Sequence, residues 1–221
     1  MLKSFLKELQ KNGRVFLCVF FPEKCIVCRK EGAYLCAKHK ELPPAPKNEA
    51  IFHFIDHVHA TTAYHVFSVK KIVEFLKFRG FRSVGALMAK EIAEDVPKSF
   101  WHNAVLVPIP LHWTRKFWRG FNQSEILAFE LTKQIPELKL SCGLRRIKRT
   151  QQQSKLSKNA RGKNMQDVFS WEASSPVPTR VILVDDVVAS GATLDSAGKV
   201  LKQAGVKIVD AVVFARGGKD N

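Results

Sequence analysis

Two adjacent acids, Asp185 and Asp186, directly follow the uninterrupted apolar run 181–184. Such a run is typical of a central strand in a parallel sheet, and we expect this strand to end at Val184. The acids would then lie at the carboxyl edge of the sheet, where open α/β sheets bind ligands. Two vicinal carboxylates can accept hydrogen bonds from two neighbouring hydroxyls, such as those of a ribose, or hold a hydrated divalent metal ion. Because unpaired carboxylates are costly to bury, a ligand-binding role is favoured over an acidic strand end that only precedes a helix.

A loop of small and hydroxyl-bearing residues comes shortly after the acids and leads into a helical pattern. Small residues let a phosphate approach the backbone, and the amides and dipole at a helix N-terminus favour an anion. A diol clamp joined to a phosphate cradle predicts a 5-phosphorylated ribose as the ligand. The cradle comprises Ala189, Ser190, Gly191, Ala192 and Thr193.

Two short pairs of metal-ligand residues, Cys25-x2-Cys28 and Cys36-x2-His39, lie close together near the N-terminus. Facing knuckles of this kind suit tetrahedral zinc, and a closed set of four ligands is structural rather than catalytic. The alternative is a set of free thiols with a chance histidine. A disulfide framework is disfavoured, since nothing marks the chain as secreted.

The composition is that of an ordinary globular protein with a strong excess of basic residues. There are 36 Lys and Arg against 20 Asp and Glu, which gives a net charge of +16. Such a surface attracts phosphates, nucleic acid or anionic lipid, although a generally basic proteome is an alternative explanation. No apolar run reaches the roughly 20 residues that a membrane span needs.

The elements that must position these residues follow from hydrophobic periodicity and from turn residues. Helices are expected at 68–80, 83–96, 122–135 (with Asn122 as N-cap) and 193–205, and strands at 103–110, 180–184 and 207–217. Strands that alternate with helices predict an α/β domain with a mainly parallel sheet. Four parts are expected: an amphipathic and apolar segment 1–21, a zinc knuckle 22–42, a Pro-rich linker 43–50 and a single domain 51–221. The first segment could lie on a membrane surface or, as we favour, dock on the protein's own core.

The loop around the acid pair resembles the phosphoribosyl-pyrophosphate (PRPP) binding motif of type I phosphoribosyltransferases. The segments 75–80, 107–128 and 146–169, together with the cysteine knuckle, are similar to the ComF family of competence-associated, phosphoribosyltransferase-like proteins. This resemblance covers roughly residues 20–217. It implies a type I phosphoribosyltransferase-like domain behind a small zinc knuckle, with PRPP and Mg²⁺ as ligands. It also implies a role in natural transformation, in which incoming single-stranded DNA is handled on the cytoplasmic side.

The resemblance also implies roles for individual residues. Asp185 and Asp186 would bind the ribose hydroxyls, and the cradle 189–193 the 5-phosphate. Candidates for contacts to the pyrophosphate are Arg115, Arg119, Asn122 and Gln123. The segment 149–164 would be the active-site flap, with matching positions at Arg149, Thr150, Gln153, Arg161 and Asn164. The sequence departs from the family at Ala189-Ser190, where a Thr-Thr pair is usual, and at Gln152, where a proline is expected.

The basic character of the flap suits this chemistry. Residues 138–166 contain no acid and nine Lys or Arg. In this reaction class pyrophosphate leaves C1 of the ribose, so basic groups and Mg²⁺ stabilise the leaving group while a closed flap excludes water. No dedicated base is needed for a good nucleophile, and the sequence does not decide whether turnover occurs. An active phosphoribosyltransferase with an unidentified acceptor and no DNA role is therefore the alternative.

The segment 112–121 alternates aromatic rings with cations. Bases of single-stranded DNA can stack on such rings while the cations bind phosphates, at ~1–3 kcal/mol per stacked base. The rings are Trp113, Phe117, Trp118 and Phe121, and the cations are Arg115, Lys116 and Arg119. The alternative is that the rings lie in the core and the cations line the pyrophosphate site. Further partners that the resemblance implies are other DNA-uptake or recombination proteins and a peripheral contact with the inner face of the cytoplasmic membrane.

Overall fold

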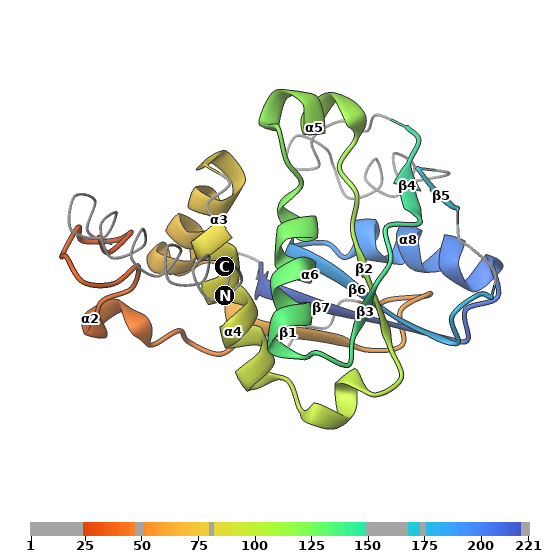
Figure 1. Cartoon of the computed structure of the whole chain (residues 1–221), viewed down its shortest axis with the longest axis horizontal. Coiled ribbons are helices and arrows are strands. Elements are labelled where there is room, and N and C mark those ends of the chain that lie inside the picture. The colour runs from red at the N-terminus through yellow and green to blue at the C-terminus, as the bar shows by residue number, and fades with distance from the viewer. Residues whose placement is uncertain (1–23, 47–50, 80–81, 149–167, 173–175, 218–221) are drawn as a thin grey trace, which may run out of the picture. The chain divides into compact units, whose positions relative to one another are not determined.

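The computed structural model describes residues 24–46, 51–79, 82–148, 168–172 and 176–217 (Figure 1). Its contacts divide the chain into two compact units, Met1–Leu42 and Pro43–Asn221. Within the described ranges, no helix has the length and apolarity that crossing a membrane requires.

A five-stranded sheet in the order β1-β7-β6-β2-β3 forms the centre of the larger unit. Its strands are β1 (Val58–Ala63), β2 (Val105–Pro108), β3 (Lys139–Leu140), β6 (Arg180–Val188) and β7 (Ile208–Arg216). All neighbouring strands run parallel, which confirms the predicted α/β class. The central strand β6 has the long apolar run because residues 181–184 are buried on both faces of the sheet.

Helices cover both faces of this sheet, as Figure 1 shows. The larger unit contains α3 (Phe67–Arg79), α4 (Arg82–Asp95), α5 (Trp113–Arg119), α6 (Gln123–Gln134) and α8 (Ala192–Gln203), with a 3-10 turn η1 at Lys98–Trp101. Of these, α5 does not pack on the sheet. The four helices expected from periodicity are confirmed to within two residues at each end. The described part of the chain also contains β1, β3 and α5, which the sequence patterns did not predict.

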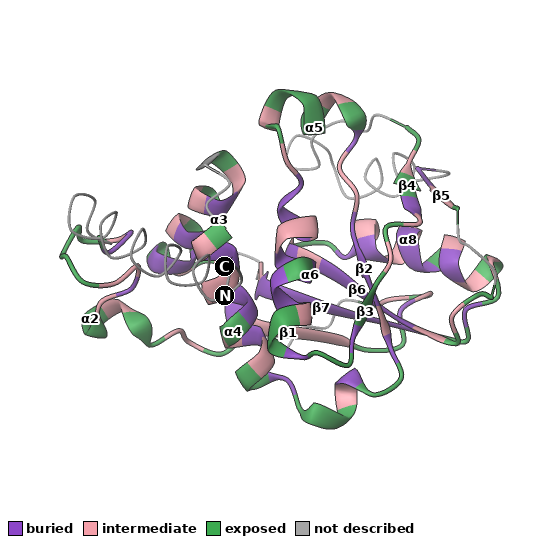
Figure 2. Cartoon of the chain, viewed as in Figure 1, coloured by how far each residue is buried: buried purple, intermediate pink, exposed green. Residues whose placement is uncertain are grey.

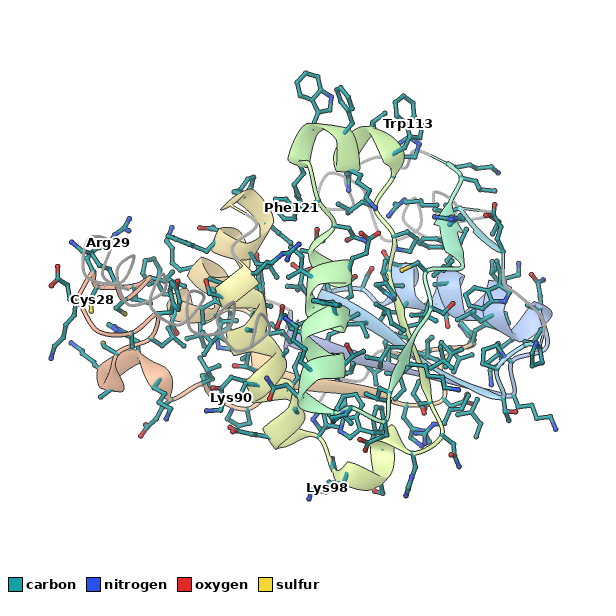
Figure 3. The ribbon with its side chains drawn as sticks, viewed as in Figure 1. Cys28, Arg29, Lys90, Lys98, Trp113 and Phe121 are labelled. Carbon is teal, nitrogen blue, oxygen red and sulfur yellow. The ribbon has the colours of Figure 1, made fainter. Side chains whose placement is uncertain are left out.

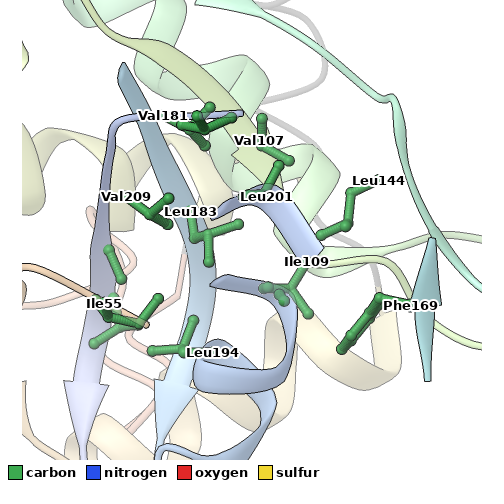
Figure 4. Packing of buried hydrophobic residues seen from close by; sticks show 14 of the residues in the cluster. Ile55, Val107, Ile109, Leu144, Phe169, Val181, Leu183, Leu194, Leu201 and Val209 are labelled. Atoms are coloured by element: carbon green, nitrogen blue, oxygen red, sulfur yellow. The ribbon is translucent and has the colours of Figure 1, made fainter. Parts of the chain in front are cut away.

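Alternate residues of β6 build two separate cores. Val181 and Leu183 pack with Leu194 and Leu201 of α8 on one face (Figure 4). On the other face, α4 and α6 pack against each other and against the sheet. The central strands β2, β6 and β7 are therefore mostly buried in Figure 2, whereas α5 contains no buried residue.

A small antiparallel pair of strands stands apart from the main sheet. It consists of β4 (Leu144–Arg146) and β5 (Phe169–Trp171), in which Arg145 lies opposite Ser170. Leu144 and Phe169 are buried in the same core as α8, so this pair is anchored to the domain.

Candidate functional site

The acid pair lies where β6 loses one of its two neighbouring strands. The ladder between β2 and β6 ends at Pro108 and Val184, whereas the ladder with β7 continues to Val188. The predicted strand end at Val184 is therefore wrong for β6 itself, because the backbone keeps pairing after the apolar side chains stop. The predicted end is correct for the pairing of β6 with β2, which stops at Val184. Asp185 and Asp186 therefore come directly after the carboxyl end of β2.

Residues from two helices fix the two carboxylates. The Ser124 hydroxyl donates to Asp185 Oδ1 at 2.8 Å, and the Asp186 amide donates to the same oxygen at 2.9 Å. Lys77 Nζ of α3 lies 2.7 Å from Asp186 Oδ2. Gln123 Nε2 approaches Asp186 Oδ1 at 3.5 Å, which is a long contact. A carboxylate oxygen can accept more than one hydrogen bond, so both carboxylates can still accept from the hydroxyls of a ligand.

Burial and mutual repulsion make this pair electrostatically costly. Burial and the neighbouring Asp186 carboxylate raise the pKa of Asp185 to about 7. Burial alone would lower the pKa of Lys77, but attraction to Asp186 raises it. Lys77 therefore stays charged and offsets one of the two acids. Neither Lys77 nor Ser124 was predicted as a site residue, although Lys77 lies in the segment 75–80 that resembles the family.

The first turn of α6 is held in place by Asn122. Its side-chain carbonyl accepts from the Ser124 amide at 3.1 Å, as predicted for an N-cap, and its amide group donates to Ile109 O at 3.0 Å. Asn122 is only 1% exposed. Its side chain therefore positions Gln123 and Ser124 toward the acids, and both of its polar groups are already engaged.

The predicted phosphate cradle forms the turn between β6 and α8. Gly191 is the N-cap of α8 with φ +77°, a conformation that favours glycine. A Cβ at this position would lie 2.5 Å from the ring of Phe52, so glycine is also required sterically. The N-terminus of this 12-residue helix points its first amides at the loop, an arrangement that suits a phosphate.

The segment that carries Phe52 is itself tied to α8. Asp195 Oδ1 accepts from the His53 amide at 2.8 Å and from the Phe54 amide at 2.7 Å. The cradle is thus supported from both sides, by β6 and by residues 52–54.

Two arginines, Arg119 and Arg146, lie near the acid pair, and Arg115 lies near both of them. Burial and the nearby Arg115 lower the pKa of Arg146 to about 10. Burial also lowers the pKa of Arg119. The Asp186 carboxylate acts to raise this pKa, and the Arg115 charge acts to lower it further. Arg119 Nη1 donates to Gln123 Oε1 at 2.7 Å. Guanidinium groups this close repel one another, and a bound polyanion such as pyrophosphate would relieve that repulsion. Arg146 lies in the basic stretch 138–166 but was not itself predicted.

A pocket of about 180 Å³ lies between the β2 end, α5, α6 and β4. An ion pair of 2.8 Å between Lys116 and Glu125 forms part of its wall. Its lining residues are Pro108, Pro110, Leu111, Trp113, Lys116, Glu125, Cys142, Leu144, Arg145 and Arg146. The predicted flap residues Arg149, Thr150, Gln153, Arg161 and Asn164 lie outside the described residues.

The aromatic rings of α5 are on the surface. Trp113, Phe117 and Trp118 are 70%, 79% and 87% exposed, and Figure 3 shows Trp113 on the outside of the fold. The alternative that the rings lie in the core is therefore wrong for these three, whereas Phe121 is partly buried.

The N-terminal unit brings the four predicted metal ligands together. Their donor atoms lie within 4.8 Å of one another, and this is the one such group among the described residues. Zinc–sulfur bonds of about 2.3 Å place tetrahedral sulfur ligands about 3.8 Å apart. Here Cys28 Sγ and Cys36 Sγ are 3.7 Å apart, and Cys25 Sγ and His39 Nδ1 are 3.6 Å apart. The cluster therefore fits a metal ion such as zinc.

The local fold of this unit explains the convergence of its ligands. Lys24 and Glu31 form an antiparallel bridge, and Gly32 continues the turn with φ +110°. His39 lies in the short helix α2 (Ala37–Lys40), which begins directly after Cys36. Burial raises the pKa of the Cys25 thiol, but hydrogen bonds from the backbone of Cys28 and Cys36 bring it down to about 6.

Comparisons with known proteins agree with a phosphoribosyltransferase-like domain around the acid pair. The model of the phosphoribosyl transferase domain matches residues 119–221. Competence protein F of Haemophilus influenzae is 34% identical over 50% of this chain and 49% of its own length. DNA utilization protein YhgH of Salmonella typhimurium is 29% identical over 66% of both chains. Competence protein ComFC of Bacillus subtilis is 29% identical over 62% of this chain and 55% of its own length. The chain thus spans about half to two thirds of these relatives.

Proposed function

We propose that this chain, as a member of the ComF family of phosphoribosyltransferase-like proteins, binds PRPP or a related phosphoribosyl ligand. The ligand would bind at the acid pair. The observation that carries the proposal is the position of Asp185 and Asp186 between a helix N-terminus and Arg119 and Arg146, which Arg115 adjoins. A ligand whose diol donates hydrogen bonds and lies between two anionic phosphate groups is complementary to this arrangement.

Each part of such a ligand has a counterpart in the site. The vicinal hydroxyls would donate to the carboxylates of Asp185 and Asp186, whose described contacts leave them able to accept further hydrogen bonds. The 5-phosphate would bind at the N-terminus of α8, and the pyrophosphate would face Arg115, Arg119 and Arg146.

The residues present also fit Mg²⁺. It prefers carboxylate and phosphate oxygens, and Asp185 and Asp186 supply the former. When bound with PRPP, the ion neutralises negative charge on the departing pyrophosphate. The chain's own part is to hold the ribose through the acids and the pyrophosphate through the arginines. Transfer to an unidentified acceptor is the corresponding proposal for an enzymatic activity.

Calorimetric titration of PRPP with Mg²⁺ tests this assignment. The double variant Asp185→Asn/Asp186→Asn removes both acceptor charges and should weaken binding at least about tenfold, or about 1.4 kcal/mol. Asp95→Asn is the control, because it removes a partly exposed carboxylate of α4 that pairs with His59. Unchanged PRPP affinity in a folded double variant would show that the ligand does not bind at the acid pair.

A second function, binding of single-stranded DNA, is favoured by the exposed face of α5. This helix has no acid and presents three exposed rings beside Arg115, Lys116 and Arg119. Rings without core partners next to cations suit stacked bases and phosphates. Relatives named as competence and DNA utilization proteins support a role in competence. We therefore propose handling of incoming single-stranded DNA on the cytoplasmic side of the membrane.

Fluorescence anisotropy with a labelled oligo(dT) tests this second proposal. Replacing Trp113, Phe117 and Trp118 together by Ala should weaken binding more than about tenfold, because each stacked base contributes ~1–3 kcal/mol. Phe129→Ala is a matched control, since this ring is 46% exposed and also lies beside a cation, Lys133 at 4.5 Å. Wild-type affinity should fall steeply with salt. Absence of binding near physiological salt would exclude the DNA role.

A further inference from the structure

Arg119 belongs both to the ligand site and to the exposed aromatic surface. On the site side, it donates to Gln123, which in turn approaches Asp186. On the surface side, its guanidinium carbon lies 6.0 Å from the ring centre of Phe78. That ring is 76% exposed. The same side chain therefore faces a candidate pyrophosphate position and an exposed ring.

Helix α3 makes a second connection between the two regions. Lys77 forms the ion pair with Asp186, and the next residue, Phe78, is the exposed ring under Arg119. The same end of α3 therefore contacts both the acid pair and Arg119.

Two exposed rings neighbour Arg119, one in sequence and one in space. Trp118 precedes it on α5 and is 87% exposed, while Phe78 reaches it from α3. A single strand that stacks on α5 and continues to Phe78 would place its phosphates at Arg119. A guanidinium makes its strongest, bidentate contact with one phosphate at a time.

We infer that the phosphoribosyl ligand and single-stranded DNA compete for this protein through Arg119. The inference rests on the proposed function and adds regulation of the same site. A bound pyrophosphate group would engage Arg119 and neutralise positive charge that Arg115 and Arg146 otherwise offer to DNA. By thermodynamic linkage, bound DNA lowers the affinity for the phosphoribosyl ligand by the same factor. The supply of a phosphoribosyl diphosphate thus controls release of the strand.

The test measures oligo(dT) affinity with and without saturating PRPP and Mg²⁺ at constant ionic strength. PRPP should weaken DNA binding about tenfold, within the usual range of coupling between sites. Sodium sulfate at equal ionic strength is the control for general screening and should have no comparable effect. Titration of PRPP in the presence of saturating oligo(dT) should give the same factor.

Two variants assign the coupling to Arg119. Arg119→Gln should weaken both ligands and reduce the coupling factor toward one. Trp118→Ala should weaken DNA alone and leave both PRPP affinity and the coupling unchanged. If Arg119→Gln does not fold, Arg119→Lys keeps the charge without the bidentate geometry and should reduce the coupling.

The outcomes separate this inference from the proposed function. If both ligands bind and neither affects the other, or if PRPP strengthens DNA binding, the competition is wrong while the proposed function stands. If either ligand fails to bind wild-type protein, the corresponding part of the proposed function and the competition both fail. If Arg119→Gln binds both ligands with full coupling, the assignment to Arg119 is overturned.

Discussion

At the scale of single residues, the acid pair is an electrostatically costly feature of the structure. Two carboxylates share a largely buried position, and three groups reduce the cost: the Ser124 hydroxyl, the Asp186 amide and the Lys77 ammonium. The pKa of Asp185 is still raised to about 7, by burial first and by Asp186 second. The buried acids therefore lower the stability of the folded protein, and hydrogen bonds donated by a ligand's hydroxyls would offset this cost.

This residue predicts a particular dependence of stability on pH. The folded pKa of Asp185 is about 7 and the unfolded value is near 3.9. Between these values only the folded state holds the proton, so stability falls as pH rises to about 7 and then levels off. Asp185→Asn removes this cost, so its stability relative to wild type should be about 1–2 kcal/mol higher at pH 8 than at pH 5, after allowance for solvent screening.

Urea unfolding of both proteins in EDTA at the two pH values measures the difference. Groups that titrate in both proteins cancel in the comparison. A variant whose relative stability is the same at pH 5 and pH 8 would show that Asp185 is already ionised at pH 5.

At the scale of elements, the first turn of α6 links the β2 end to the acids. Asn122 is capped onto its own helix and tied to Ile109, just beyond β2, so Ser124 reaches Asp185 with fixed geometry. The helix is thus a positioning element and not a direct source of charge.

Loss of this cap should affect both stability and ligand binding. Asn122→Ala removes a buried cap and leaves Ile109 O without its donor, at a cost of about 1–3 kcal/mol in the free energy of unfolding. PRPP affinity should fall as well, because Ser124 and Gln123 lose their support. Chemical denaturation and calorimetry provide the two readouts. Gln134→Ala, at the exposed end of α6, is the control and should change neither.

The same scale shows how far sequence reasoning reaches. Helices with regular apolar spacing, such as α4 with Val84, Met88 and Ile92 buried, are predictable because periodicity reports burial directly. Strand β1 is not, because most of it is half-buried and its Thr and His residues interrupt the pattern. The end of β6 was placed too early because backbone pairing continues past the point where side chains turn polar.

The candidate site was predictable in its local motif and not in its long-range partners. Asp185, Asp186 and Gly191 lie within seven residues of one another in the sequence, so their spacing identifies the motif. Lys77 and Arg146 come from α3 and β4, and only the folded sheet brings them to the acids. The exposure of the α5 rings likewise depends on packing that sequence spacing does not report.

At the scale of the whole molecule, the chain combines a domain with an extensive core and a small unit with almost none. In the described part of the small unit, Cys25, Ile26 and Leu35 are the buried hydrophobic residues. So small a core rarely holds a fold without a metal or disulfides. We therefore propose that zinc, held by Cys25, Cys28, Cys36 and His39, stabilises this unit.

Metal analysis and chelation test the zinc proposal. Purified protein should contain a single zinc ion per chain, and Cys28→Ser should lose it. Removal of zinc should expose residues 24–42 to protease while the sheet domain keeps its thermal transition, because the ion stabilises only the unit that binds it. A metal-free protein that resists proteolysis in this region would contradict a structural site.

The order of strands in the sheet has a consequence for how the protein is made. Strand β1 has one neighbour in the sheet, β7, and pairs such as Val58 with Ala211 join segments roughly 150 residues apart. On the ribosome, β1 must therefore wait for β7 to emerge before it can pair. Nascent chains that still lack β7 present an unpaired strand edge, so translation speed and chaperone access become determinants of yield. A ligand of the acid pair would not assist at this stage, because the strands and helices around Asp185 and Asp186 come together only when the sheet forms.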